Sequence, residues 1–215
     1  MSWLYKLERK IGRFAIPNLM LVIVTGMLTV FAADFVIPAL NLSGYLSLDW
    51  HMVMQGQVWR LITFIFLPPS SSVLWIFITL YFNYLIGHTL ENTWGDFKFN
   101  VYYFCGVVGN IIAAMLTGYG MNSYLNLSLF FAFAVLYPDF QVMLFFILPV
   151  KIKYLALIDA AYFVLMLIVG DWATRVAILL SLVNFILFFG GDFVRMIRQQ
   201  AGYQKTRRNF RKYMK

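Results

Sequence analysis

The fold is decided by residues 16–37, IPNLMLVIVTGMLTVFAADFVI, an apolar run in which Asp34 is the only charged residue. A transmembrane helix needs about 20 such residues, because each residue adds roughly 1.5 Å across a hydrocarbon core about 30 Å thick. Pro38 ends the run. The run is too long for a signal peptide and has no small-residue cleavage site, so it predicts a retained transmembrane helix.

Five further apolar runs predict five more spans. They cover residues 72–91, 97–117, 122–137, 152–169 and 174–189. Residues 39–70 are too polar to span the bilayer and too apolar for a free loop, so we predict a folded segment in the outer headgroup region. The apolar run 140–148 is too short to span, and we expect it to be interfacial or re-entrant.

These runs predict an all-α membrane protein with three parts. Residues 1–15 form a basic N-terminus, residues 16–190 a six-span membrane domain, and residues 191–215 a basic tail. The composition agrees, because 62% hydrophobic and 12% charged residues exceed what a water-soluble domain of 215 residues can bury.

The positive charges predict the topology. Fifteen of the 17 Lys and Arg lie in residues 1–15, 91–98, 138–153 and 190–215, and the other two are Arg60 and Arg175. With six spans, this bias places both termini in the cytoplasm. The net charge of +8 therefore suits anionic membrane lipids rather than nucleic acid. The short loops and the basic tail fit a bacterial plasma membrane.

The sequence predicts no metal and no cofactor. Cys105 is the only cysteine, which excludes an internal disulfide, a Cys-based zinc site and a Cys-x-x-Cys redox motif. Its apolar surroundings predict a small buried core residue.

Several motifs fall in a recognisable order along this frame. The outer segment contains Trp59-Arg60, within QVWRLIT at 57–63. The second span ends in GHTLENTWGDFKF at 87–99, which places Glu91 four residues before Gly95. The third span carries Tyr102-Tyr103 and Gly109-Asn110. Together these features resemble the rhomboid superfamily, and the resemblance implies a six-helix bundle with a membrane-embedded loop, L1, between the first two spans.

The resemblance also implies a place for a catalytic dyad, which in active rhomboids pairs a serine in span four with a histidine in span six. The G-x-S-G pattern falls on residues 121–124, MNSY, which keeps Ser123 but neither glycine. The H-x-G-G-F pattern falls on residues 181–185, SLVNF, so the base becomes Ser181. The H-x-x-x-N pattern that supplies the oxyanion side falls on Trp75 to Thr79, which retains neither residue.

A neutral serine is a poor nucleophile without an adjacent base. Ser123 is therefore predicted to be a vestigial nucleophile and Ser181 to mark the missing base, which makes an enzyme the less favoured interpretation. His51 and His88 are predicted to lie away from Ser123.

The remaining polar residues have structural and functional interpretations. Trp59, Arg60, Glu91 and Gly95 suit loop fixing and helix packing, with Arg60 binding loop carbonyls. Asp159 lies within the fifth span, where a carboxyl group is costly and indicates either function or a hydrogen bond to another helix. Its predicted partners are His88, Asn83 or Asn110. Asn126, Ser128 and Asn184 suit interhelical hydrogen bonds.

Three functions stay open from the sequence. The first is a catalytically inactive, derlin-like rhomboid relative that binds or chaperones transmembrane segments of client proteins. The second is an active rhomboid-type intramembrane serine endopeptidase with an unrecognised base. The third is a small transporter that uses Asp159, which the lack of paired broken helices disfavours. The sequence does not predict an oligomeric state.

Overall fold

The computed structural model describes residues 2–144 and 148–189. The predicted basic tail, 191–215, lies outside the described residues. The described chain is an all-α membrane bundle. Five of its helices are long and apolar enough to cross a membrane: α2 (Leu19–Val36), α6 (Val73–Trp94), α7 (Asp96–Thr117), α9 (Ile152–Val169) and the last described helix, Trp172–Phe189. The chain is therefore a multi-pass membrane protein, and these helices lie within a few residues of the predicted spans.

The predicted fourth span is shorter than the others. It forms α8 (Ser123–Leu136), whose 14 residues extend about 21 Å at 1.5 Å per residue. Its flanks explain the length, because Pro138 follows closely and Asn122 is bound to the outer segment. This helix lies at the centre of the bundle, where it packs against α6, α7 and α9.

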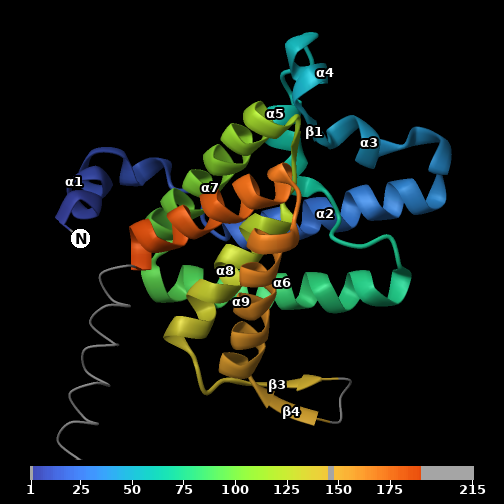
Figure 1. The fold of residues 1–215 in the computed structure, drawn as a ribbon. Helices are drawn as coiled ribbons and strands as arrows, with labels where there is room; N and C mark the ends of the chain where they lie inside the picture. Colours follow the sequence, from blue (N-terminus) through green and yellow to red (C-terminus); the bar gives the residue numbers. More distant parts are fainter. Residues whose placement is uncertain (1, 145–147, 190–215) are drawn as a thin grey trace, which may run out of the picture.

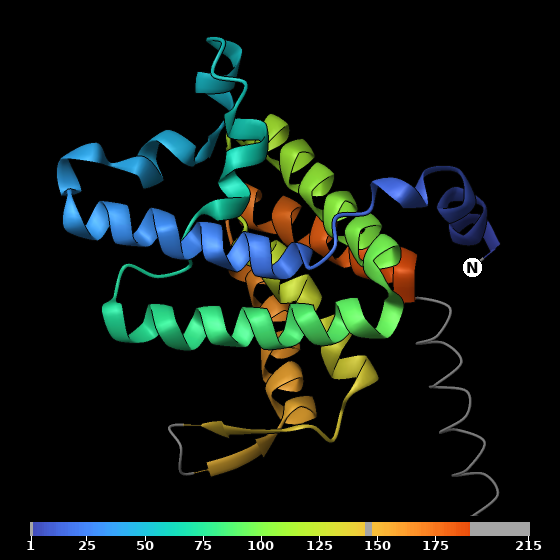
Figure 2. The same cartoon turned by 180° about the vertical axis from the view of Figure 1, so that it is seen from behind.

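The helices α2 and α6 lie alongside each other, and α7 crosses them (Figures 1 and 2). The close approach of α2 and α6 depends on Gly87, because a Cβ atom at this position would overlap the Met20 side chain. Gly106 of α7 has the same function toward Leu125 of α8. Small residues at such crossings are typical of helix packing in membranes.

The segment between the first two spans is folded, as predicted. It contains η2 (Pro38–Leu40), α3 (Leu42–Leu46), β1 (Leu48–Asp49), α4 (Trp50–Met54), α5 (Arg60–Thr63) and η3 (Phe64–Phe66). The strand β1 pairs antiparallel with β2 (Tyr119–Gly120), with Leu48 opposite Gly120. This pairing attaches the segment to the loop between α7 and α8.

Two regions of the chain form elements that the sequence did not predict. The N-terminal residues form α1 (Ser2–Ile11) and η1 (Gly12–Phe14). The apolar run 140–148 contributes to a hairpin of β3 (Gln141–Leu144) and β4 (Leu148–Lys151). A run too short to span the bilayer as a helix satisfies its backbone groups here by pairing with the strand that follows.

Candidate functional site

The candidate site lies at the first turn of α8, which begins at Ser123. Asn122 fixes the position of this turn, because its buried side-chain amide donates to the carbonyl oxygens of Phe64 at 3.3 Å and Leu67 at 2.9 Å. The outer segment therefore holds the start of α8 in place. The Ser123 side chain itself is exposed.

Ser181 reaches the same turn from the last described helix. Its part-buried hydroxyl donates to the carbonyl oxygen of Tyr124 at 2.8 Å. The structure thus brings the position of the missing base within one residue of Ser123. The Tyr124 ring, which replaces the second glycine of the motif, packs against Phe163 of α9 with ring centroids 6.2 Å apart. These contacts serve helix packing.

The described chain places no base beside Ser123. His51 is on α4 and contacts Gln55, and His88 is on α6, where it contacts Asn92 and stacks on Tyr84. The structure describes no hydrogen bond between Ser123 and either histidine. Among the described residues, no group of three or more His, Cys, Asp or Glu side chains could hold a metal ion.

Behind the site lies a small cavity between α7, α8 and the last described helix. Gly106, Ser128, Ser181 and Asn184 are among the residues that line it. Its volume of about 10 Å³ is close to the minimum that one water molecule needs. This cavity is too small for a peptide bond and its attacking groups.

The interhelical hydrogen bonds predicted for this region are present in two of three cases. Ser128 pairs with the Tyr102 hydroxyl between α8 and α7, and Asn184 donates to the Tyr102 carbonyl at 3.4 Å. Asn126 does not follow the prediction, since its buried Oδ1 atom has no partner among the described residues. The sequence did not single out Gly106, which permits these contacts.

Arg60 fixes the outer segment. Its side chain is buried and donates to the carbonyl oxygens of Gly44 at 2.8 Å and Ser47 at 2.7 Å, and its Nε donates to Gln57 at 2.8 Å. These are the loop carbonyl contacts expected for this residue. Its neighbour Trp59 is about half exposed and precedes the first residue of α5.

Glu91 joins α6 to the start of α2. One carboxylate oxygen accepts a hydrogen bond from the Leu19 backbone N–H at 2.7 Å, at the N-terminus of α2. That terminus favours negative charge. Gly95, four residues later, has φ +82° between α6 and α7, a conformation that favours glycine.

The other two candidate residues do not join helices through their side chains. Asn110 is buried and donates to the Gly106 carbonyl of its own helix. Asp159 is partly exposed on α9. The structure describes no hydrogen bond from Asp159 to Asn83, His88 or Asn110, which does not support the predicted helix–helix link.

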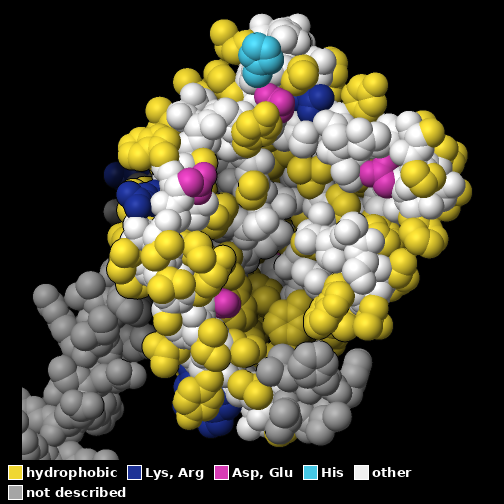
Figure 3. All heavy atoms as spheres, turned by 45° about the vertical axis from the view of Figure 1, so that its right-hand side comes forward, with side chains coloured by type: hydrophobic (Ala, Val, Ile, Leu, Met, Phe, Trp, Pro, Cys, Tyr) yellow, Lys and Arg dark blue, Asp and Glu magenta, His cyan; other side chains and the backbone are white. Residues whose placement is uncertain are grey.

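The helices α6 and α9 lie on two sides of a gap next to α8. Both pack against α8, but their contact with each other is at most marginal. Only Ile152 and Phe163 of α9 are buried. Figure 3 shows that the molecule is hollowed on this side and that hydrophobic side chains surround the hollow. The arrangement leaves apolar side chains exposed between α6 and α9.

A comparison with curated proteins gives one informative similarity. The chain is 33% identical over 89 residues to "Rhomboid-like protease 1" of Toxoplasma gondii. The matched stretch covers 40% of this chain but only 29% of the length of that protein. No protein-family model and no solved structure matches the chain. The similarity supports a relationship to the rhomboid superfamily and goes no further.

Proposed function

We propose that this chain is a catalytically inactive rhomboid-like protein that binds transmembrane segments of other membrane proteins. One observation carries the proposal. At the point where a serine protease needs a base, Ser181 donates its hydroxyl to the Tyr124 carbonyl, one residue from Ser123. A serine hydroxyl is too weak a base to take the proton from a second serine.

The absence of a base has a large energetic consequence. In a soluble serine protease, loss of the nucleophile or of the histidine lowers kcat about 10⁶-fold. Here the histidine position is occupied by Ser181, and the pattern that supplies the oxyanion side retains neither of its residues at Trp75 and Thr79. Without either contribution, Ser123 is expected to react no faster than an ordinary exposed serine.

The open side between α6 and α9 is the surface on which we propose that clients bind. Its side chains are mainly apolar, as for α9 residues Leu155, Tyr162 and Met166, which share a face of the helix with Asp159 and are at least partly exposed. Without a hydrophobic driving force between helices in lipid, packing and interhelical hydrogen bonds must supply the affinity. Asp159 offers such a bond, because its half-buried carboxyl has no described hydrogen-bond partner. We expect it to favour clients with a polar or basic residue at that depth.

The reaction side of the proposal is tested with a fluorophosphonate probe, which labels activated serines. The purified protein in lipid nanodiscs is expected to remain unlabelled and to leave a transmembrane substrate intact. Labelling or cleavage that disappears in Ser123→Ala would show an active protease and overturn the proposal of inactivity.

The binding side is tested by photo-crosslinking in the membrane. A photoreactive residue at Tyr162, on the same face of α9 as Asp159 and about half exposed, is expected to capture membrane proteins, and Asp159→Asn is expected to weaken that capture severalfold. The same residue placed at Val22 of α2, also about half exposed, is the matched control. Equal capture at both positions would contradict a client surface. A pH-dependent ion flux in liposomes that Asp159→Asn removes would instead favour a small transporter.

Topology and location belong to the same proposal. The sorting of the basic residues favours cytoplasmic termini, with Arg60 and Arg175 on the other side of the membrane. The bacterial plasma membrane stays a prediction, because the similar protein comes from Toxoplasma gondii. Protease protection of tags at the two termini in sealed vesicles tests the orientation.

A further inference from the structure

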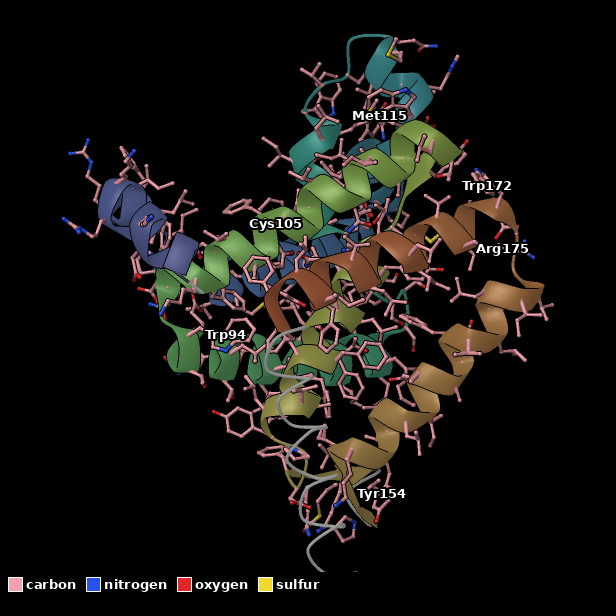
Figure 4. The ribbon with its side chains drawn as sticks, turned by 60° about the vertical axis from the view of Figure 1, so that its left-hand side comes forward. Trp94, Cys105, Met115, Tyr154, Trp172 and Arg175 are labelled. Atoms are coloured by element: carbon pink, nitrogen blue, oxygen red, sulfur yellow. The ribbon has the colours of Figure 1, made fainter. Side chains whose placement is uncertain are left out.

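A long groove runs between α7 and the last described helix, away from the face between α6 and α9. Its volume is about 540 Å³, within the range of roughly 300–1,000 Å³ that is usual for ligand pockets. Figure 4 shows these two helices side by side, with Cys105 midway along α7. The groove is lined mainly by apolar side chains that include Phe104, Cys105, Val108, Ile112, Val183 and Leu187. Such a lining suits an acyl chain.

One end of the groove is formed by the N-terminal elements. Ile11, Phe14 and Ala15 line it there, next to the start of α7. The Arg13 guanidinium lies 4.9 Å from the centroid of the Phe14 ring, which places a positive charge at this end. Lys10 is exposed on the last turn of α1.

These positive charges are not neutralised by the described protein. Among the described residues, the ion pairs are those of Asp139 with Lys151 and with Lys153, and none involves α1 or η1. The basic end of the groove is therefore available to an anion from outside the described chain.

The sequence predicted Cys105 as a small buried core residue, but its side chain is exposed and lines this groove.

We propose that this groove binds one anionic glycerophospholipid, such as phosphatidylglycerol. An acyl chain lies along the apolar floor, and the phosphate lies at Arg13 and Lys10. The site is independent of client binding, because it lies on other helices than the face between α6 and α9.

The test measures lipid retained by the full chain after extraction from mixed vesicles of phosphatidylglycerol and phosphatidylcholine. About one phosphatidylglycerol per protein is expected to remain. Lys10→Gln with Arg13→Gln should lower the affinity about 25-fold, at roughly fivefold for each cation near a membrane surface. The matched control, Lys151→Gln with Lys153→Gln, removes two basic residues elsewhere and should leave retention unchanged. Equal losses in both double variants would show general surface attraction and overturn the site.

The unique thiol reports occupancy of the apolar floor. Alkylation of Cys105 by a membrane-permeable maleimide should be severalfold slower in phosphatidylglycerol nanodiscs than in phosphatidylcholine nanodiscs. The control chain carries Cys105→Ala and Val164→Cys, whose thiol lies on α9 and should show no such difference beyond the surface effect of the lipid. If instead a chain that ends at Phe189 loses the protection in every lipid, residues 190–215 occupy the groove and the proposal fails.

Discussion

The outer segment, residues 39–70, and the α8 site, formed by the first turn of α8 with Ser181, use polar side chains in opposite ways. In the outer segment, Arg60 makes four hydrogen bonds and is almost completely buried. At the α8 site, Ser123 is exposed and Ser181 makes a single bond to a backbone carbonyl. The polar side chain at the centre of the loop is bound on several sides, whereas the two serines of the α8 site have one described side-chain hydrogen bond between them.

Asp34 extends the contrast. Its carboxylate accepts hydrogen bonds from the backbone N–H groups of Leu42 at 2.6 Å and Ser43 at 2.9 Å, which fixes α3 to the end of α2. Asp34 and Arg60 therefore hold the outer segment at two separate points through backbone groups.

The largest effect is expected from Arg60→Ala, which removes the centre of the outer segment. The carbonyl groups of Gly44 and Ser47 lose a charged donor, and we expect a loss of about 3 kcal/mol in the free energy of unfolding. Arg60→Lys keeps the charge but lacks the planar fork, so it should recover only part of the loss. Unfolding in mixed detergent micelles measures both, and Lys151→Ala is the control at an exposed basic residue. A loss no larger than that of the control would show that the hydrogen bonds of Arg60 do not stabilise the outer segment.

A somewhat smaller effect is expected at the junction of α2 and α6. Glu91→Ala removes the acceptor of the Leu19 N–H and the negative charge at the start of α2, at a cost of about 2 kcal/mol. Glu91→Gln keeps a carbonyl acceptor and should cost less than half of that. Thr89→Ala on the same helix is the matched control, because the Thr89 hydroxyl donates to the Leu85 carbonyl of its own helix. The same unfolding assay distinguishes them, and equal losses for the alanine and glutamine variants would argue against the Leu19 bond.

The sequence predicts the spans well because span length is set by the bilayer rather than by neighbours. Each apolar run of about 20 residues needs only lipid to become a helix, and α9 begins and ends at the predicted residues 152 and 169. The contacts of Arg60 with loop carbonyls were also predictable, because a buried arginine in a loop needs acceptors.

Other features depend on packing that no local pattern encodes. The pairing of β1 with β2 joins residues about 70 positions apart, and Gly106 is recognisable as a contact only once α8 lies against α7. The groove could not be predicted for the same reason, because its lining residues come from η1, α7 and the last described helix. The basic residues 6–13 indicate topology, and the sequence analysis does not predict the helix α1 that carries most of them.

Substitutions of the two serines of the α8 site should change the free energy of unfolding only slightly. Ser181→Ala removes one part-buried hydrogen bond and should cost about 1 kcal/mol or less in the free energy of unfolding. Ser123→Ala changes an exposed side chain and should stay within about 0.5 kcal/mol of the unmodified protein. Neither variant should alter photo-crosslinking from Tyr162. A loss of crosslinking in Ser123→Ala, with the fold intact, would show that the hydroxyl contributes to function after all.

The smallest effect is expected at Asp139, an exposed carboxylate at the base of the β3–β4 hairpin. Its hydrogen bonds with Lys153 and Lys151, at 2.9 Å and 3.0 Å, hold its pKa below the usual value of 3.8. A lowered folded-state pKa stabilises the hairpin above pH 3.8, and this contribution is lost as the pH falls through the folded-state pKa. Carboxyl NMR should therefore show a pKa that rises toward 3.8 in Lys153→Gln with Lys151→Gln, and less depression at high salt. An unchanged pKa in that variant would mean that the two lysines do not hold the carboxylate. Solvent screens the contacts of Asp139 with its two lysines but not the buried contacts of Arg60. Salt should therefore change the titration of Asp139 and leave the cost of Arg60→Ala nearly constant.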